Sequence, residues 1–370
     1  MKIFNTTLIT GLSLFSFSAV TSAAVIQSLT LPLTFSYETN PLYSTTNQQL
    51  ISRTTVTPRY SMSSNSGANQ WTSSASLNAV RTSEQSISQD RNDPSLNIGW
   101  AHNYETGLFS VTGLLNDQST QVTEFTDSGL IAGDNTKKTR TVSVNWRNSI
   151  TERTSLAFGG SLTNASFHGV TTTGLVNYKN ESSNAKLSYA LSEQTDVFTQ
   201  FAYSRYLPEN STSTSNTKSV NLGFTWTVSE KINTTVSIGA NETENNNNVS
   251  ESWQVSINSN YATPRTNTQF SLSRSLAPSS IGSLSESNQF ALGLSHSLTE
   301  RDNISLNMSW RENLNANKTI TNQISANYAK ELNLSWNFRL TAAHNSREDK
   351  LTNVSSSSIM ASIIYKLPDF

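Results

Sequence analysis

Hydrophobic side chains occupy alternate positions over long stretches of this 370-residue chain, and this alternation constrains its fold more than any other feature. Successive side chains of a β-strand point to opposite faces, so a period of two places the apolar residues of a run on one face. The intervening positions are rich in Ser, Thr, Asn and Gln. One clear run consists of Val220, Leu222, Phe224, Trp226 and Val228. The pattern predicts an all-β protein whose sheet has one apolar and one polar face.

The runs are unusually long, at about 10–13 residues, whereas strands of globular proteins average about 5–6. A strand that crosses a bilayer at a tilt needs about 9–11 residues. Because hydrocarbon offers no hydrogen-bonding partner to an open sheet edge, a membrane sheet has to close on itself. We therefore expect a closed antiparallel up-and-down transmembrane β-barrel of about 18 strands, within a range of 16–18.

A four-residue motif of hydrophobic residue, Ser or Thr, Glu, and polar residue recurs between the runs. It occurs at 150–153, 191–194, 228–231 and 298–301, and successive glutamates are 41, 37 and 70 residues apart. A missing member falls near 263–265 and a variant near 331–333. Each period of about 35–40 residues therefore contains two long strands, one tight turn and one longer loop, as expected of an outer-membrane barrel.

A repeat of this length is also typical of β-propellers, and sandwiches and β-solenoids are further alternatives. A propeller blade needs four strands per repeat, whereas each repeat here has two, and no blade-closing Trp-Asp or Gly-His signature occurs. The barrel is therefore favoured. Its strands are expected at 27–37, 51–63, 70–82, 94–103, 107–117, 138–150, 154–166, 176–191, 196–207, 216–229, 232–243, 250–261, 266–276, 286–298, 303–313, 319–330, 335–345 and 355–367.

Residues 1–24 have the features of a secretory signal peptide. Lys2 precedes an apolar stretch over 8–20, and Ser22-Ala23-Ala24 supplies the small residues that signal peptidase recognises. A membrane anchor helix is the alternative, but the stretch is too short and too rich in Ser and Thr to span hydrocarbon. We expect residues 25–370 to form one transmembrane barrel domain. The chain has no cysteine, so its stability has to come from backbone pairing and side-chain burial.

The charge balance argues against nucleic acid as a partner. The chain has 25 Lys+Arg and 26 Asp+Glu, a formal net charge of −1, and no concentrated basic segment. Several cations nevertheless lie on the polar phase of the strands, where they would line the barrel lumen. They are either solvated groups hydrogen-bonded to lumen Asn and Ser or parts of a selectivity filter. These candidates are Arg53, Arg59, Arg147, Lys186, Arg311 and Arg339.

No pattern in the sequence indicates an enzyme, a metal site or a cofactor. The four histidines are far apart and lack metal-ligand spacing. Neither a Gly-x-Ser-x-Gly elbow nor a His-x-Ser-Asn-Gly motif of the outer-membrane phospholipase type occurs; His296-Ser297 lacks the Asn-Gly that would follow. The acidic pairs Asp90/Asp93 and Glu124/Asp127 fall in expected loops, where solvated charge is favoured over cation binding.

The signal peptide, the order of strands and turns, and the terminal Phe370 together resemble Gram-negative outer-membrane β-barrel proteins. The chain is also loosely similar to uncharacterised exported barrels associated with surface-polysaccharide systems, and this similarity lies in segments 35–41, 93–96 and 126–130. The resemblance implies an outer-membrane location with lipid and lipopolysaccharide as partners. It also implies insertion by the outer-membrane barrel assembly machinery, for which Ile363, Tyr365 and Phe370 form the candidate signal. Pro368 departs from this signal, because proline cannot donate to a strand ladder.

Two classes of function follow from this interpretation. The first is a porin-like passive channel for small hydrophilic solutes, or a barrel associated with carbohydrate export. The second is a structural or surface-interaction barrel whose long extracellular loops bind a partner, such as a polysaccharide, while no pore is open. The loop from Asp117 to Lys138 bears on both, because it would constrict the channel if it folded inward.

Overall fold

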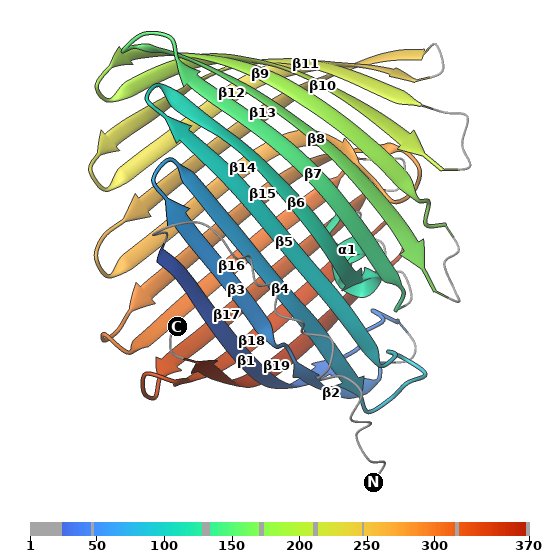
Figure 1. The fold of residues 1–370 in the computed structure, drawn as a ribbon. Helices are drawn as coiled ribbons and strands as arrows, with labels where there is room; N and C mark the ends of the chain where they lie inside the picture. The colour runs from blue at the N-terminus through green and yellow to red at the C-terminus, as the bar shows by residue number, and fades with distance from the viewer. Residues whose placement is uncertain are drawn as a thin grey trace.

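The computed structural model describes residues 24–45, 48–127, 134–169, 174–209, 214–245, 248–314 and 318–367. Within them, the chain forms one antiparallel sheet of 19 assigned strands that closes on itself where β1 pairs with β19. Figure 1 shows the strands tilted around a central lumen, with short turns at one end and longer connections at the other. The expected closed antiparallel barrel is confirmed. Of the expected signal peptide only Ala24, at the start of β1, is described, and Phe370 also lies outside the described residues.

The strand bounds agree with the expected ranges to within a few residues. The strands are β1 (Ala24–Thr39), β2 (Leu50–Val56), β3 (Arg59–Ser66), β4 (Asn69–Thr82), β5 (Arg91–Tyr104), β6 (Gly107–Ser119), β7 (Thr136–Ser149), β8 (Thr154–His168), β9 (Tyr178–Ser192), β10 (Thr195–Pro208), β11 (Ser215–Ser229), β12 (Ile232–Asn245), β13 (Asn248–Ala262), β14 (Thr266–Pro278), β15 (Leu284–Ser297), β16 (Asp302–Asn313), β17 (Thr319–Glu331), β18 (Trp336–Glu348) and β19 (Asn353–Leu367).

β2 and β3 are two parts of one barrel strand. Both pair with β1 on one side and with β4 on the other, and the register continues across the interruption, with Val56 opposite Leu33 and Arg59 opposite Thr30. The interruption falls at Pro58, which has no N–H to donate to the ladder. The 19 assigned strands therefore make a barrel of 18 strands, the number that the sequence predicts.

The recurring turn motif owes its Ser or Thr to a local hydrogen bond. The Thr151 hydroxyl accepts bonds from the backbone N–H groups of Arg153 and Thr154, at 3.2 and 3.0 Å. Thr299, Ser192 and Ser229 accept an N–H from two residues ahead in the same way. A hydroxyl bound to nearby backbone stabilises a tight turn. The missing member and the variant of the repeat use Thr263 and Asn333 for this purpose.

The alternating sequence places apolar side chains outside the barrel and polar ones inside. On β11 and β12, the outward pairs are Leu222 with Ile238 and Phe224 with Val236, while Asn221 and Gly239 form an inward pair. The outward side chains are well exposed; Leu222 and Ile238 each retain about three fifths of their surface, which in a bilayer would face lipid. Near the tight turns, Trp100 contacts the rings of Trp71 and Phe109, as in the aromatic belts of membrane barrels.

A short helix, α1 (Thr120–Asp127), lies in the connection between β6 and β7. Figure 1 shows it within the outline of the barrel, near the end that has the longer connections. Its side chains contact the β1–β2 and β14–β15 connections, which belong to distant parts of the barrel wall. The described part of the loop from Asp117 to Lys138, which carries α1, therefore lies inward. Among the described residues, no helix is both long and apolar enough to cross a membrane.

Candidate functional site

The helix α1 is held inside the barrel by a buried carboxylate. Glu124 is fully buried, and its Oε1 lies 3.2 Å from Nζ of Lys137 on β7. Its other oxygen, Oε2, accepts a hydrogen bond from the Ser280 hydroxyl in the β14–β15 connection. A buried charge is tolerated when it is paired and hydrogen-bonded, as here. Glu124 therefore links α1 to two elements that lie far apart around the barrel.

An apolar contact secures a second side of α1. The rings of Phe125 and Tyr43 stack with their centroids 4.7 Å apart, and both rings belong to a buried cluster with Val354 of β19. Asn40 fixes the connection that carries Tyr43, because its side chain bonds the backbone of Ser44. This cluster joins α1 to the seam where the first and last strands of the barrel meet.

Of the predicted lumen cations, Arg53 is the one that contacts α1. It lies on the inward face of β2, forms an ion pair with Glu38 of β1, and its Nη2 lies 3.2 Å from Oε1 of Gln121. The Arg53 side chain is largely buried. Arg53 is therefore part of the contact between the barrel wall and α1, and its guanidinium holds a lumen-side carboxylate beside the helix.

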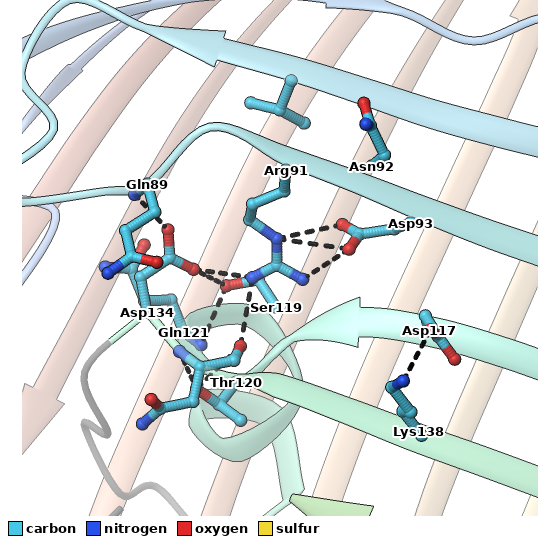
Figure 2. A network of polar contacts seen from close by, with 12 residues as sticks. Gln89, Arg91, Asn92, Asp93, Asp117, Ser119, Thr120, Gln121, Asp134 and Lys138 are labelled. Carbon is cyan, nitrogen blue, oxygen red and sulfur yellow. Dashed lines mark hydrogen bonds and ion pairs between the residues drawn. The ribbon is translucent and has the colours of Figure 1, made fainter. Parts of the chain in front are cut away.

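A second polar network holds the two ends of the connection that carries α1, at the end of β6 and just before β7 (Figure 2). Arg91 on β5 forms ion pairs with Asp93, at 2.8 Å, and with Asp134, at 2.6 Å. Asp134 also accepts hydrogen bonds from the hydroxyls of Ser88 and Ser119, both at 2.7 Å. Burial alone raises the pKa of Asp134, but these hydroxyl bonds and the Arg91 charge outweigh burial and hold its pKa below the usual range.

These networks correct the interpretation of Asp93 and Glu124 as solvated loop charge, whereas Asp90 is exposed as expected and the side chain of Asp127 lies outside the described part of the structure. Asp93 is nearly buried and paired with Arg91, and Glu124 is fully buried against Lys137. Sequence reasoning also missed Lys137 and Ser280. Within the described residues, no group of acidic or histidine side chains has an arrangement suited to a metal ion.

Two predicted lumen cations, Arg147 and Lys186, lie on the inner wall near the end that has the tight turns. Both face inward and they are separated by one residue, because Ala157 of β8 pairs with Arg147 on one side and with Lys186 on the other. The Lys186 ammonium lies 3.8 Å from the centroid of the Phe198 ring on β10, in a cation–π contact. Phe198 in turn lies against Gly223 of β11, where any Cβ would be only 2.5 Å from the ring.

The remaining predicted lumen cations are dispersed around the inward face of the wall. Arg311 pairs across the sheet with Gln289 and Thr321, and its Nε donates to Asn313. Arg59 and Arg339 are exposed on inward positions of β3 and β18. The structure thus brings together Arg147 and Lys186, places Arg53 against α1, and leaves the other three apart. Their role in selectivity stays a prediction.

One cavity on the inner wall is lined by uncharged side chains. This cavity of about 760 Å³ runs along β12 to β18, and most of the residues that line it have amide or hydroxyl side chains. The amides that line it come from inward positions of successive strands: Asn233, Asn258, Asn260, Gln269, Asn307, Gln323 and Asn345. Such groups donate and accept hydrogen bonds without imposing a charge. This surface is suited to contact with water and neutral polar groups.

The candidate assembly signal lies on the closing strand. Ile363 and Tyr365 of β19 face outward opposite Leu33 and Leu31 of β1, and the Tyr365 ring lies 5.0 Å from that of Trp336. Recognition by an assembly machinery stays a prediction.

Comparison with known proteins identifies the class of fold. No protein-family model matches the chain, and no curated protein sequence matches it. Among solved structures, OccAB4 of Acinetobacter baumannii is similar over 94% of this chain and 98% of its own, with 11% identity and a TM-score of 0.52. The structure of Pseudomonas aeruginosa OpdK with vanillate is similar over 94% of this chain and 99% of its own, with 9% identity and a TM-score of 0.52.

The chain thus has the fold of Gram-negative outer-membrane β-barrel proteins. OpdK is itself described as an outer membrane protein.

Proposed function

We propose that this protein is an outer-membrane, porin-like passive channel for small hydrophilic solutes. One observation carries the proposal: a closed 18-strand barrel surrounds a lumen with a cavity lined mainly by amide and hydroxyl side chains, and the helix α1 lies inward at one end. A barrel of this strand number encloses space that its own side chains do not fill, unlike a barrel of eight strands. The fold shared with OpdK and OccAB4 supports the outer-membrane location.

The mechanism would be diffusion without a chemical step. A solute would enter past α1 and exchange its hydration for bonds to the Asn and Gln side chains of the β12 to β18 wall. Those bonds are individually weak relative to water, so the solute would not be trapped. Arg147 and Lys186 on the facing part of the wall would bias the passage of ions toward anions, since fixed charges in a lumen set its selectivity. Solute identity, including any carbohydrate, would follow from transport measurements.

The alternative is a structural or surface-interaction barrel with no open pore. The contacts of α1 with opposite sides of the wall favour it, because Glu124 bonds both β7 and the β14–β15 connection. A barrel of this kind would act through its outer loops.

Planar-bilayer conductance of the refolded chain separates the two functions. The proposal expects discrete conductance steps in the wild type, together with uptake of small sugars in liposome-swelling assays. Steps that appear only when Glu124 is replaced by alanine would indicate a barrel closed by α1. If neither protein conducts while both resist SDS until boiled, the barrel is folded and the channel proposal is wrong.

A further inference from the structure

The outer surface of the barrel carries a group of basic side chains at its loop-bearing end. We define the basic rim as Lys138 and Arg140 of β7, His168 of β8 and Lys179 of β9. Arg140, His168 and Lys179 are exposed, and Lys138 is partly exposed. All four point outward, because they share the phase of the outward apolar residues of their strands, such as Val142 on β7 and Leu162 on β8.

The strand register brings these residues together in adjacent rows. Arg140 pairs with Asn164, which pairs with Lys179 on its other side. Lys138 pairs with Ser166 one row further out. These side chains, with His168, line a cavity of about 650 Å³ on the outside of the barrel. The basic rim is therefore a concave surface contributed by three strands, with room for a headgroup.

The rim lies directly beyond the apolar surface. Val142 and Leu162 form the next outward row and are 53% and 60% exposed. They are two residues from Arg140 and Asn164, which corresponds to about 7 Å along a strand. In a membrane this distance places the cations at the level of lipid headgroups, while the stems of Lys and Arg cover the last apolar row.

The cations of the rim are less closely paired with carboxylates than most other outward cations at this end of the barrel. Four other outward cations form ion pairs with carboxylates, namely Arg81–Asp90, Lys218–Glu242, Arg274–Glu286 and Lys318–Glu312, and Arg205 of β10 lies opposite Glu181 of β9 in the strand register. Lys138 is 3.9 Å from Asp117, a long contact, and no ion pair involves Arg140 or Lys179 within the described part of the chain. Glu209 lines the same cavity and accepts a hydrogen bond from the Asn177 amide, and the outward Glu181 of β9 lies two residues from Lys179.

We propose that the basic rim binds the phosphate groups of lipopolysaccharide in the outer leaflet. The charge of these phosphates complements Arg140 and Lys179, and their attachment to acyl chains matches a cationic cavity that adjoins an apolar wall. Arg and Lys are the side chains that recognise phosphate. The inference rests on the outer-membrane location in the proposed function, but it does not require an open pore.

The test compares two charge-removing double variants of the full chain, refolded into zwitterionic detergent. Arg140→Gln/Lys179→Gln removes two rim charges, and Arg81→Gln/Lys218→Gln removes two outward charges elsewhere as a matched control. Binding of fluorescently labelled lipopolysaccharide is titrated, and resistance to SDS before boiling shows that each variant folds. Loss of two charge-assisted phosphate contacts is expected to weaken binding by at least about tenfold in the rim variant. The control is expected to bind like wild type.

Three results would overturn the proposal. The first is unchanged binding by the folded rim variant, and the second is equal weakening of both double variants, which would indicate general electrostatic attraction. The third is binding of dephosphorylated lipopolysaccharide as tight as that of intact lipopolysaccharide, or full displacement of lipopolysaccharide by inorganic phosphate at a similar concentration. Either result would indicate that the rim binds another ligand. Conductance of the same preparations in zwitterionic bilayers tests the channel proposal separately. A protein that binds lipopolysaccharide normally but gives no conductance steps would refute the channel proposal and would not contradict this inference.

Discussion

The carboxylate of Glu124, on the only helix among the described residues, lies 3.2 Å from the ammonium of Lys137 on the barrel wall, and both side chains are buried. The same carboxylate accepts a hydrogen bond from Ser280 in the β14–β15 connection. One side chain therefore joins a helix inside the lumen to two distant parts of the wall. The position of α1 depends on this charge, because removing one member of a buried ion pair is strongly unfavourable.

Replacing Glu124 by alanine is expected to free α1 from the wall. Breaking a buried ion pair by removing one partner costs about 3–5 kcal/mol, which would raise the population with a displaced helix by about 100-fold or more. Single-channel recordings should show larger or noisier conductance steps than wild type. The barrel itself should persist, because its strand ladder does not include Glu124.

The matched control is Glu105→Ala, which removes an exposed glutamate from the tight turn between β5 and β6. It should leave conductance unchanged. Equal conductance of the Glu124 variant and wild type would show that α1 does not limit the flow of ions.

The loop that carries α1 should be released by acid, and only at low pH. The pKa of Asp134 is lowered in the folded protein, so ionised Asp134 stabilises the folded loop above the ordinary Asp pKa of about 3.9. This stabilisation is lost as the pH falls through the lower, folded-state value. Conductance should therefore be constant between neutral pH and about pH 5 and should change below about pH 4. At neutral pH, the Asp134→Asn variant should already show the conductance that the wild type shows below about pH 4. A midpoint near pH 6 in the wild type would contradict this assignment.

The barrel wall could be predicted from sequence because lipid imposes a local rule. The expected range 216–229 differs by one residue from β11, since the outward side chains from Val220 to Val228 are all apolar. The split of one strand into β2 and β3 was not anticipated, although Pro58 marks its position. A missing N–H interrupts a ladder without changing the alternation, so periodicity alone does not reveal it.

The interior site could not be predicted in the same way. Glu124 and Ser280 are 156 residues apart in the chain, and neither belongs to a recognisable motif. Their contact depends on the path that an inward loop takes inside the lumen. The alternation of polar and apolar residues predicts the strands but not this path. The sequence did place Arg53 on the lumen side, but only the structure connects it with Gln121 of α1. Aromatic Phe198 on an inward position also departs from the polar pattern of the lumen.

The packing of Phe198 makes Gly223 a sensitive position in the wall. A Cβ at Gly223 would lie 2.5 Å from the Phe198 ring and would also meet the backbone oxygen of Val236. Because backbone cannot move aside easily, Gly223→Ala is expected to destabilise the barrel by about 1–3 kcal/mol. Gly113→Ala is the matched control, since no atom lies within 4 Å of its Cβ position. The measurement is the temperature at which each barrel loses its resistance to SDS. This temperature should be lower than in wild type for the Gly223 variant and unchanged for the Gly113 variant. A Gly223 variant as heat-resistant as wild type would show that the ring and the strand adjust freely.

Removing the paired lumen cations should change ion preference. Arg147 and Lys186 lie on inward positions on either side of Ala157, so their fields add in the same part of the lumen. Fixed charges act over about 10 Å at 0.1 M salt, which makes selectivity strongest in dilute solution. Arg147→Gln/Lys186→Gln should therefore shift the reversal potential under a potassium chloride gradient toward cation preference. Arg81→Gln/Lys218→Gln removes the same charge from outward positions and should leave that potential near the wild-type value. Equal shifts in the two double variants would show that overall protein charge, rather than these two side chains, sets the preference.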